Sequence, residues 1–164
     1  MKTIYLSLGS NVGDRAANIA RSIEALKDAG VRVVRQSSLY VTEPVDFEPQ
    51  GWFLNCALEA ETDLMPRQLL RALRGIERQL GTKKLVRRGP RAIDMDILFF
   101  GSSVVRTPEL EIPHPRIAER RFVLVPLAEI APSLRHPILG MSVTELLGAT
   151  QDRSSVRPWR PAKP

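Results

Sequence analysis

Apolar and polar residues alternate along several stretches of the chain, which is the periodicity of half-buried β-strands. In the first stretch, Ile4, Leu6 and Leu8 share one face. The second stretch is identified by its β-branched residues rather than by strict alternation. The pattern therefore predicts strands at residues 3–9, 31–40, 53–61 and 92–100, with a short return strand at residues 104–105.

Apolar residues recur at a spacing of three or four in two longer stretches, as on the buried face of a helix. The first stretch ends at Gly30, and the second begins at Pro66 and ends at Gly81. These are the positions that glycine and proline prefer at helix ends. We expect helices at residues 14–29 and 66–80, loops at 42–51 and 82–91, and short helical pieces near 116–121 and 123–130.

The predicted order of elements is β-α-β-β-α-β, followed by a C-terminal extension. This is the order of ferredoxin-like α+β folds, in which an antiparallel sheet carries both helices on one face. The other face would be open to a ligand or to the extension. A chain of 164 residues fits one domain, which we place at residues 1–150. The basic residues 151–164 are expected to form a flexible tail.

Composition excludes several classes of protein. The longest apolar run, residues 122–128, is far shorter than the roughly 20 residues of a membrane-spanning helix. Cys56 is the only cysteine, which excludes an internal disulfide and a cysteine metal cluster. The N-terminus does not resemble a signal peptide, and no coiled-coil pattern is present. We therefore expect a cytoplasmic monomer that does not bind membranes.

Positive charge is concentrated in one part of the chain. The net charge is +6, and residues 67–91 contain nine lysines and arginines but a single acid, Glu77. A basic segment of this kind is typical of a protein with an anionic partner. The alternative is a solvated helix face that binds nothing.

Two carboxylates on the last predicted strand are the sharpest chemical feature. Asp94 and Asp96 occupy positions i and i+2, so they share a face, with Cα atoms about 6.6–7 Å apart. Such anions repel each other and are costly to desolvate unpaired, so a cation is expected between them. Mg²⁺ fits, because it binds one or two carboxylates together with substrate phosphates. The alternative is ion pairing with nearby arginines such as Arg91.

Phosphate binding, if it occurs, would depend on side chains. The sequence contains neither G-x-x-x-x-G-K-[ST] nor G-x-G-x-x-G, and the planar guanidinium group of arginine suits phosphate. His114, which lies between two prolines, is a further candidate functional residue. The alternative is that it has a structural role. Phe53 and Asn55 share a strand face, where an amide could hydrogen-bond a heterocycle. The alternative is ordinary core packing.

Six stretches of the chain match a known family: residues 5–15 (YLSLGSNVGDR), 37–44 (SSLYVTEP), 53–55 (FLN), 89–98 (GPRAIDMDIL), 112–116 (IPHPR) and 120–127 (RRFVLVPL). Through them the chain resembles the 6-hydroxymethyl-7,8-dihydropterin pyrophosphokinases of folate biosynthesis. The resemblance covers about residues 1–132, and the family fold is also ferredoxin-like. It implies an enzyme that transfers pyrophosphate from ATP to the hydroxymethyl group of the dihydropterin, giving the pterin diphosphate and AMP.

The resemblance also implies roles for particular residues. Asp94 and Asp96 would hold two Mg²⁺ ions and, with Arg91 and Lys84, form the catalytic set. ATP would be bound by Glu77, Lys84, Arg87, Arg91, Ile97, His114 and Arg120. The pterin would be bound by Thr42, Glu43, Pro44, Val45, Phe53, Asn55, Asp94 and Phe122.

The chain departs from the family pattern at two positions. Thr82 stands where the family usually has an arginine, although Lys84 keeps a second positive charge nearby. Arg88 stands where the family has a tryptophan, so a flat aromatic wall would be replaced by a guanidinium group that can stack only in part. We expect the loop at residues 82–88 to be mobile and to close on ATP.

Two other functions are compatible with parts of the pattern. The departures at Thr82 and Arg88 suggest a catalytically weakened relative. The charge and topology also suit a ferredoxin-like RNA-binding module, but the aromatic RNP1 motif is absent. Two aspartates on the ligand face would also repel nucleic acid, so we expect no nucleic-acid partner.

Overall fold

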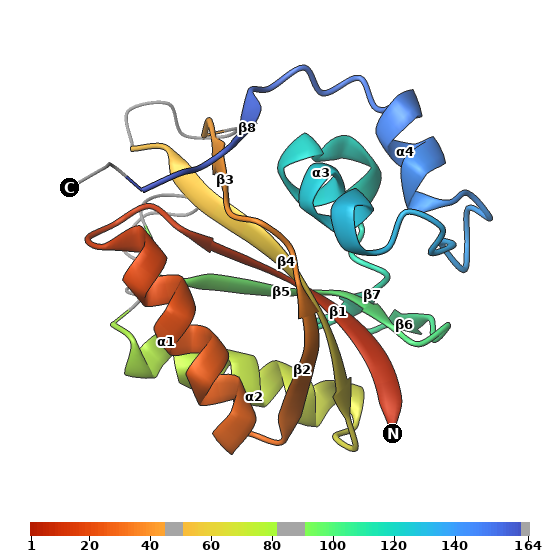
Figure 1. The fold of residues 1–164 in the computed structure, drawn as a ribbon. Helices are drawn as coiled ribbons and strands as arrows, with labels where there is room; N and C mark the ends of the chain where they lie inside the picture. Colours follow the sequence, from red (N-terminus) through yellow and green to blue (C-terminus); the bar gives the residue numbers. More distant parts are fainter. Residues whose placement is uncertain (45–50, 82–90, 162–164) are drawn as a thin grey trace.

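The computed structural model describes residues 1–44, 51–81 and 91–161. Its order of elements begins β-α-β-β-β-α-β, which differs from the predicted series by one additional strand, and continues into an extension that contains two further helices (Figure 1). The strands are β1 (Lys2–Ser10), β2 (Val31–Gln36), β3 (Tyr40–Thr42), β4 (Phe53–Thr62), β5 (Asp94–Phe100), β6 (Val105–Arg106), β7 (Glu111–Ile112) and β8 (Val156–Pro158). The helices are α1 (Arg15–Asp28), α2 (Pro66–Gln79), α3 (Arg121–Ile130) and α4 (Val143–Ala149), with a 3-10 turn at Ile117–Glu119.

The main sheet has the strand order β5-β1-β4-β3-β8, and β2 also pairs with β4. Each pair in it is antiparallel. The arrangement of β1, β2, β4 and β5 confirms the ferredoxin-like prediction. The single strand expected at residues 31–40 is a correction, because it is divided into β2 and β3. At the break, the amide of Ala57 donates to the hydroxyl oxygen of Ser37 rather than to a backbone carbonyl.

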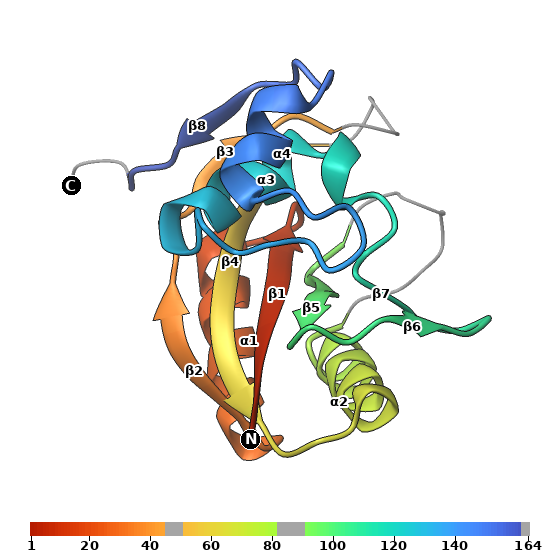
Figure 2. The same ribbon diagram turned by 90° about the vertical axis from the view of Figure 1, so that its right-hand side faces the viewer.

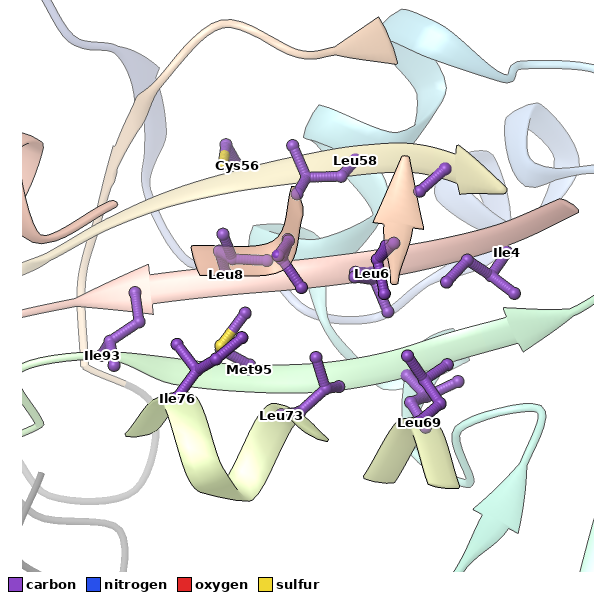
Figure 3. Packing of buried hydrophobic residues seen from close by; sticks show 14 of the residues in the cluster. Ile4, Leu6, Leu8, Cys56, Leu58, Leu69, Leu73, Ile76, Ile93 and Met95 are labelled. Carbon is purple, nitrogen blue, oxygen red and sulfur yellow. The ribbon is translucent and has the colours of Figure 1, made fainter. Parts of the chain in front are cut away.

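The first hydrophobic core lies between the sheet and the helices α1 and α2. The alternating residues of β1 point into it, as the sequence pattern requires. Figure 3 shows Leu69, Leu73 and Ile76 of α2 packing toward the strands. Burying one such side chain stabilises the fold by about 1.5–3 kcal/mol relative to leaving it exposed. This core fixes which residues of β5 face away from the helices.

A second core covers part of the opposite face of the sheet. It is built around Leu124 and Leu127 of α3 and Val143 and Leu146 of α4, which pack against Phe99 of β5. Figure 1 shows α3 and α4 on the side of the sheet opposite α1 and α2. The extension therefore occupies much of this face, which is one of the two outcomes expected for it. Helix α4 was not predicted from the sequence.

The expectation that residues 151–164 form a flexible tail is wrong for the part that the structure describes. Residues 156–158 form β8, which pairs with β3. The amide of Trp159 donates to the carbonyl of Leu39 at 2.9 Å, and Trp159 also packs against the first core. The physical reason is that an edge strand leaves backbone groups unpaired, and β8 satisfies those of β3.

A domain boundary at residue 150 stays a prediction. Among the described residues, no helix is long and apolar enough to cross a bilayer.

Candidate functional site

The two aspartates of β5 lie on the sheet face opposite the first core, as predicted. Asp94 is paired with Gly9 and Asp96 with Ser7 on β1. Both carboxylates are half-buried, while the intervening Met95 is fully buried in the core. Because β1 is also paired with β4, the row that contains Asp94 and Gly9 continues across the sheet to Asn55. The register therefore brings together a carboxylate and an amide that lie far apart in the sequence.

Asn55 is held rigidly in this row. It is only 4% exposed, and its Nδ2 donates to the hydroxyl oxygen of Thr42 at 2.5 Å. A Cβ atom built onto Gly9 would overlap Oδ1 of Asn55 and contact the ring of Phe53 at 3.4 Å. Glycine is therefore required at position 9 by the close approach of Asn55. The donor bond to Thr42 leaves Oδ1 as the group through which Asn55 can accept a hydrogen bond.

Two side chains of α2 cover the outer edge of β5 between the two aspartates. The amide of Met95 donates to Oε2 of Glu77 at 2.9 Å, and Nη1 of Arg74 donates to the carbonyl of Met95 at 2.9 Å. Since β5 is an edge strand, these backbone groups would otherwise lack partners in the sheet. We call Arg74 and Glu77 the edge clamp. From the sequence, Arg74 was only one of the cations of the basic segment at residues 67–91, and its contact with Met95 was not predicted.

The edge clamp also sets the electrostatics of the site. Glu77 is 3% exposed, and burial raises its pKa, with Arg74 opposing the rise. Nη1 of Arg74 lies 2.9 Å from Oε1 of Glu77 as an ion pair rather than an aligned hydrogen bond. Nη2 of Arg74 also lies 4.0 Å from Oδ1 of Asp96. One guanidinium group thus neutralises a buried anion and approaches one of the two site carboxylates.

The carboxylates fit a magnesium ion that shares its coordination with a ligand. Asp94 and Asp96 supply the oxygen donors that Mg²⁺ prefers. Among the described residues, no group of three or more His, Cys, Asp or Glu side chains could hold a metal on its own. A site of two carboxylates suits Mg²⁺ only when water or phosphate oxygens complete the shell. The donor set therefore fits a metal whose shell is completed by water or by phosphate oxygens.

A cavity of about 230 Å³ opens beside Asp96. It brings together four residues of interest, Arg74, Asp96, Ile97 and His114, from α2, β5 and the segment after β7. Its other walls are Leu70, Pro115 and the residues 108–111. The cavity therefore combines apolar surface with a cation, an imidazole and three carboxylates, those of Asp96, Glu109 and Glu111.

His114 is held as a neutral imidazole. Its backbone amide donates to the carbonyl of Leu98 at 3.1 Å, and its Nδ1 accepts from the amide of Arg116 at 3.1 Å. Burial, with the positive charges of Arg120 and Arg116, lowers the pKa of His114 to about 4. Since Nδ1 accepts, the ring proton lies on Nε2, which can act as a neutral donor.

The remaining predicted site residues lie on elements around this face. Arg120 precedes α3, and its guanidinium carbon lies 5.5 Å from the ring centroid of Phe122. The backbone of Arg91 exchanges two hydrogen bonds with Asn11, one to the side-chain Oδ1 at 2.6 Å and one from the amide at 3.0 Å. Glu43 follows β3, and its carboxylate accepts from the amide of Ser155 at 2.5 Å. Pro44 is half-buried beside it.

Some predictions fall outside the described residues. Val45, Lys84 and Arg87 are among them, as are the departures at Thr82 and Arg88. The expected closure of residues 82–88 on ATP also lies there. These remain predictions.

Comparison with known proteins identifies close relatives. A family model described as 7,8-dihydro-6-hydroxymethylpterin-pyrophosphokinase matches residues 5–132. A Methylorubrum extorquens protein named 2-amino-4-hydroxy-6-hydroxymethyldihydropteridine pyrophosphokinase is 46% identical over 148 residues, which cover 90% of this chain and 92% of that protein. A Bacillus subtilis protein of the same name is 42% identical over 157 residues, covering 95% and 89%.

Other relatives are much longer than this chain. The folic acid synthesis protein fol1 of Pneumocystis carinii is 40% identical over 160 residues, which are 98% of this chain but 22% of that protein. A crystal structure of a Plasmodium falciparum HPPK-DHPS triple mutant with pteroate matches with a TM-score of 0.71 and 16% identity, covering 90% of this chain and 43% of that one. The chain thus spans a minor part of these longer proteins, and the structural match supports the fold alone.

Proposed function

The chain belongs to the 7,8-dihydro-6-hydroxymethylpterin-pyrophosphokinase family, and we propose that its site transfers pyrophosphate from ATP to 6-hydroxymethyl-7,8-dihydropterin. The products would be the pterin diphosphate and AMP, in folate synthesis. The observation that carries the proposal is the placement of Asp94 and Asp96 between a cavity and a rigid amide. The cavity offers a donor imidazole and an arginine, as a nucleotide requires, while Asn55 offers a fixed acceptor to a heterocycle.

Mg²⁺ is proposed as the cofactor, with two ions held by Asp94 and Asp96. The support is the donor set, which fits a metal whose shell is completed by triphosphate oxygens. When bound, such ions would neutralise the triphosphate and stabilise the negative charge that develops during transfer. The ion pairing that we weighed as an alternative has partial support, since Arg74 approaches Asp96.

The nucleotide is proposed to bind at the cavity beside β5. Ile97 offers an apolar surface for the base, and Nε2 of the neutral His114 can donate to a phosphate oxygen. Arg91 and Arg120 are proposed phosphate ligands, together with Lys84 and Arg87. Glu77, buried against Met95, would act by holding β5 rather than by contacting ATP directly.

The pterin is proposed to bind beside Asn55, at the end of the row that runs from Asp94 through Gly9 to Asn55. Oδ1 of Asn55 is oriented to accept from the amino group or ring N–H of the pterin, because Nδ2 is already bound to Thr42. The rings of Phe53 and Phe122 are the proposed stacking surfaces. The backbone of Thr42 to Val45 would supply the remaining edge contacts, with Asp94 near the reacting end.

The proposed chemistry is an in-line displacement at the β-phosphorus. A bond forms from the hydroxymethyl oxygen to this phosphorus, and the bond from the phosphorus to the oxygen shared with the α-phosphate breaks. That oxygen keeps the electron pair and leaves as part of AMP, and the hydroxyl proton is released to solvent. The chain contributes by positioning both substrates and by placing cationic and N–H donors against the phosphates. None of the proposed residues is assigned as a general base.

The test is AMP formation that depends on both ATP and the dihydropterin. We expect Asp96→Ala to abolish this turnover while the melting temperature stays close to that of the unaltered protein. Asp28→Ala, an exposed position at the end of α1, is the control and should leave the rate unchanged. Omission of Mg²⁺ should also stop the reaction. Undiminished turnover by Asp96→Ala would refute the metal assignment.

The unaltered protein decides between the other functions. A rate of pterin-dependent AMP formation comparable to that of the related pyrophosphokinases would exclude a catalytically weakened relative. Salt-sensitive RNA binding without turnover would instead support a nucleic-acid module. We also propose that the enzyme acts as a cytoplasmic monomer that binds neither nucleic acid nor membranes, and sedimentation measurements would test the oligomeric state.

A further inference from the structure

Residues 151–161 form a strap across the edge of the sheet, outside the residues 5–132 that match the family model. One part of the strap holds the end of β3. The amide of Ser155 donates to Oε1 of Glu43 at 2.5 Å, and its carbonyl accepts from the amide of Glu43 at 3.3 Å. The residues of β8 then continue this pairing along β3, from Thr42 to Tyr40.

The other part of the strap holds the beginning of α3. The N-cap residue of this helix, Arg120, makes no side-chain capping bond. Instead, Oδ2 of Asp152 accepts from the amide of Arg121 at 2.8 Å, and the carbonyl of Ser154 accepts from Nε of Arg121 at 3.1 Å. A carboxylate at a helix N-terminus stabilises the helix through the hydrogen bond and the helix dipole.

Asp152 is itself fixed by its neighbour. Its Oδ1 accepts from both the amide of Ser154 at 2.9 Å and the hydroxyl at 2.5 Å. Partial burial raises the pKa of Asp152, but the hydrogen bonds from Ser154 and Arg121 outweigh this and hold it below its usual value. The carboxylate therefore stays ionised and rigid at neutral pH. By accepting from both Arg121 and Ser154, it links the beginning of α3 to the part of the strap that pairs with β3.

We propose that the strap is a positioning element for the pterin substrate, with Asp152 as its central positioning residue. The inference rests on the proposed function. The strap ties the end of β3, which carries Thr42, to the start of α3, which carries Phe122. It thereby fixes the distance between Thr42, which holds the amide of Asn55, and Phe122, the ring proposed to stack on the pterin. Positioning of this kind acts on substrate orientation, to which transfer rates are sensitive.

The strap should affect the nucleotide less than the pterin, because Arg120, the N-cap residue of α3, is the proposed phosphate ligand that adjoins it. The cavity beside Asp96 is lined by residues of α2, of β5 and of the segment 108–115. Figure 2 shows β8 at the opposite end of the molecule from α2. Within the part of the chain that the structure describes, Asp152 and Ser155 hydrogen-bond Arg121 and Glu43, and neither of these residues lines the cavity. A clearly larger loss for the pterin than for ATP is therefore the signature of the strap.

The experiment compares Asp152→Ala with Asp152→Asn, which can keep one of the two acceptor contacts. Initial rates of AMP formation are measured against each substrate in turn. Loss of a helix cap of this kind predicts a rise of about five-fold in the KM for the pterin in Asp152→Ala. The KM for ATP should stay within about two-fold, and Asp152→Asn should recover part of the loss. Arg160→Ala, exposed in the same strap, is the matched control and should change neither KM.

The outcomes separate the two proposals. If the unaltered protein forms no pterin-dependent AMP, the proposed function is wrong. If it turns over and Asp152→Ala raises both KM values equally, or neither, the strap proposal is overturned. Should Asp152→Ala fail to fold, Arg121→Ala removes the bond from Nε to Ser154 and decides by the same criterion. A selective rise in the pterin KM in that variant supports the strap, and its absence overturns it.

Discussion

At the scale of single residues, His114 combines a functional position with a cost to stability. An unfolded histidine has a pKa near 6.5, whereas burial and the neighbouring arginines lower the pKa of His114 to about 4 in the fold. Between these values the unfolded chain binds more protons than the folded one, so stability falls as pH falls through this window. The loss at pH 4 amounts to at most about 3 kcal/mol.

Substitution of His114 by glutamine should remove this dependence. The free energy of unfolding, measured with urea from pH 7 to pH 4, should fall more steeply in the unaltered protein than in His114→Gln. Carboxylates titrate in both proteins, so the difference between the two curves isolates the imidazole. A difference that stays constant across this range would show that His114 is not held neutral by the fold.

At the scale of elements, the edge clamp satisfies the outer backbone groups of β5 at the site. Glu77→Ala removes the acceptor for the amide of Met95 and leaves Arg74 without its buried partner. We expect a loss of about 2 kcal/mol in unfolding free energy, since an unsatisfied buried group costs about 1–3 kcal/mol. Glu77→Gln keeps an oxygen acceptor and should lose clearly less. Equal losses in thermal or urea unfolding would mean that the hydrogen bond to Met95 is not what matters.

Local patterns were sufficient to predict the four main strands, the two helices α1 and α2 and the shared face of Asp94 and Asp96, because these depend on periodicity within a few residues. The division of residues 31–40 was not predictable in this way. It depends on the hydroxyl of Ser37 and on Glu129 of α3, whose Oε2 accepts from the amide of Ser38 at 2.9 Å. That glutamate is a partner from a distant part of the chain.

The same limit explains what was missed in the site and the tail. Gly9 is the last residue of the strand predicted at residues 3–9, but its need for glycine arises from Asn55 on another strand. Residues 151–161 have the composition of a frayed end, yet they satisfy the open edge of β3. Contacts between distant segments carry no periodic signal in either partner. Sequence motifs indicate which residues matter there, and the register of the sheet shows how they meet.

At the scale of the whole molecule, one sheet is shared by two hydrophobic cores, so the cores should unfold together. Leu69 belongs to the first core and Leu127 to the second, and both are fully buried. Substitution of either by alanine should cost about 2–5 kcal/mol. Of the two tryptophans, Trp159 packs against the first core, whereas Trp52 is already exposed in the fold. The change in tryptophan fluorescence on unfolding therefore reports chiefly on the first core, whereas far-UV circular dichroism follows all helices. We expect Leu127→Ala to shift both urea transitions to the same lower midpoint, as Leu69→Ala does, because neither core can lose its packing without disrupting the strands between them. Separate midpoints in Leu127→Ala would instead identify α3 and α4 as an independently unfolding unit.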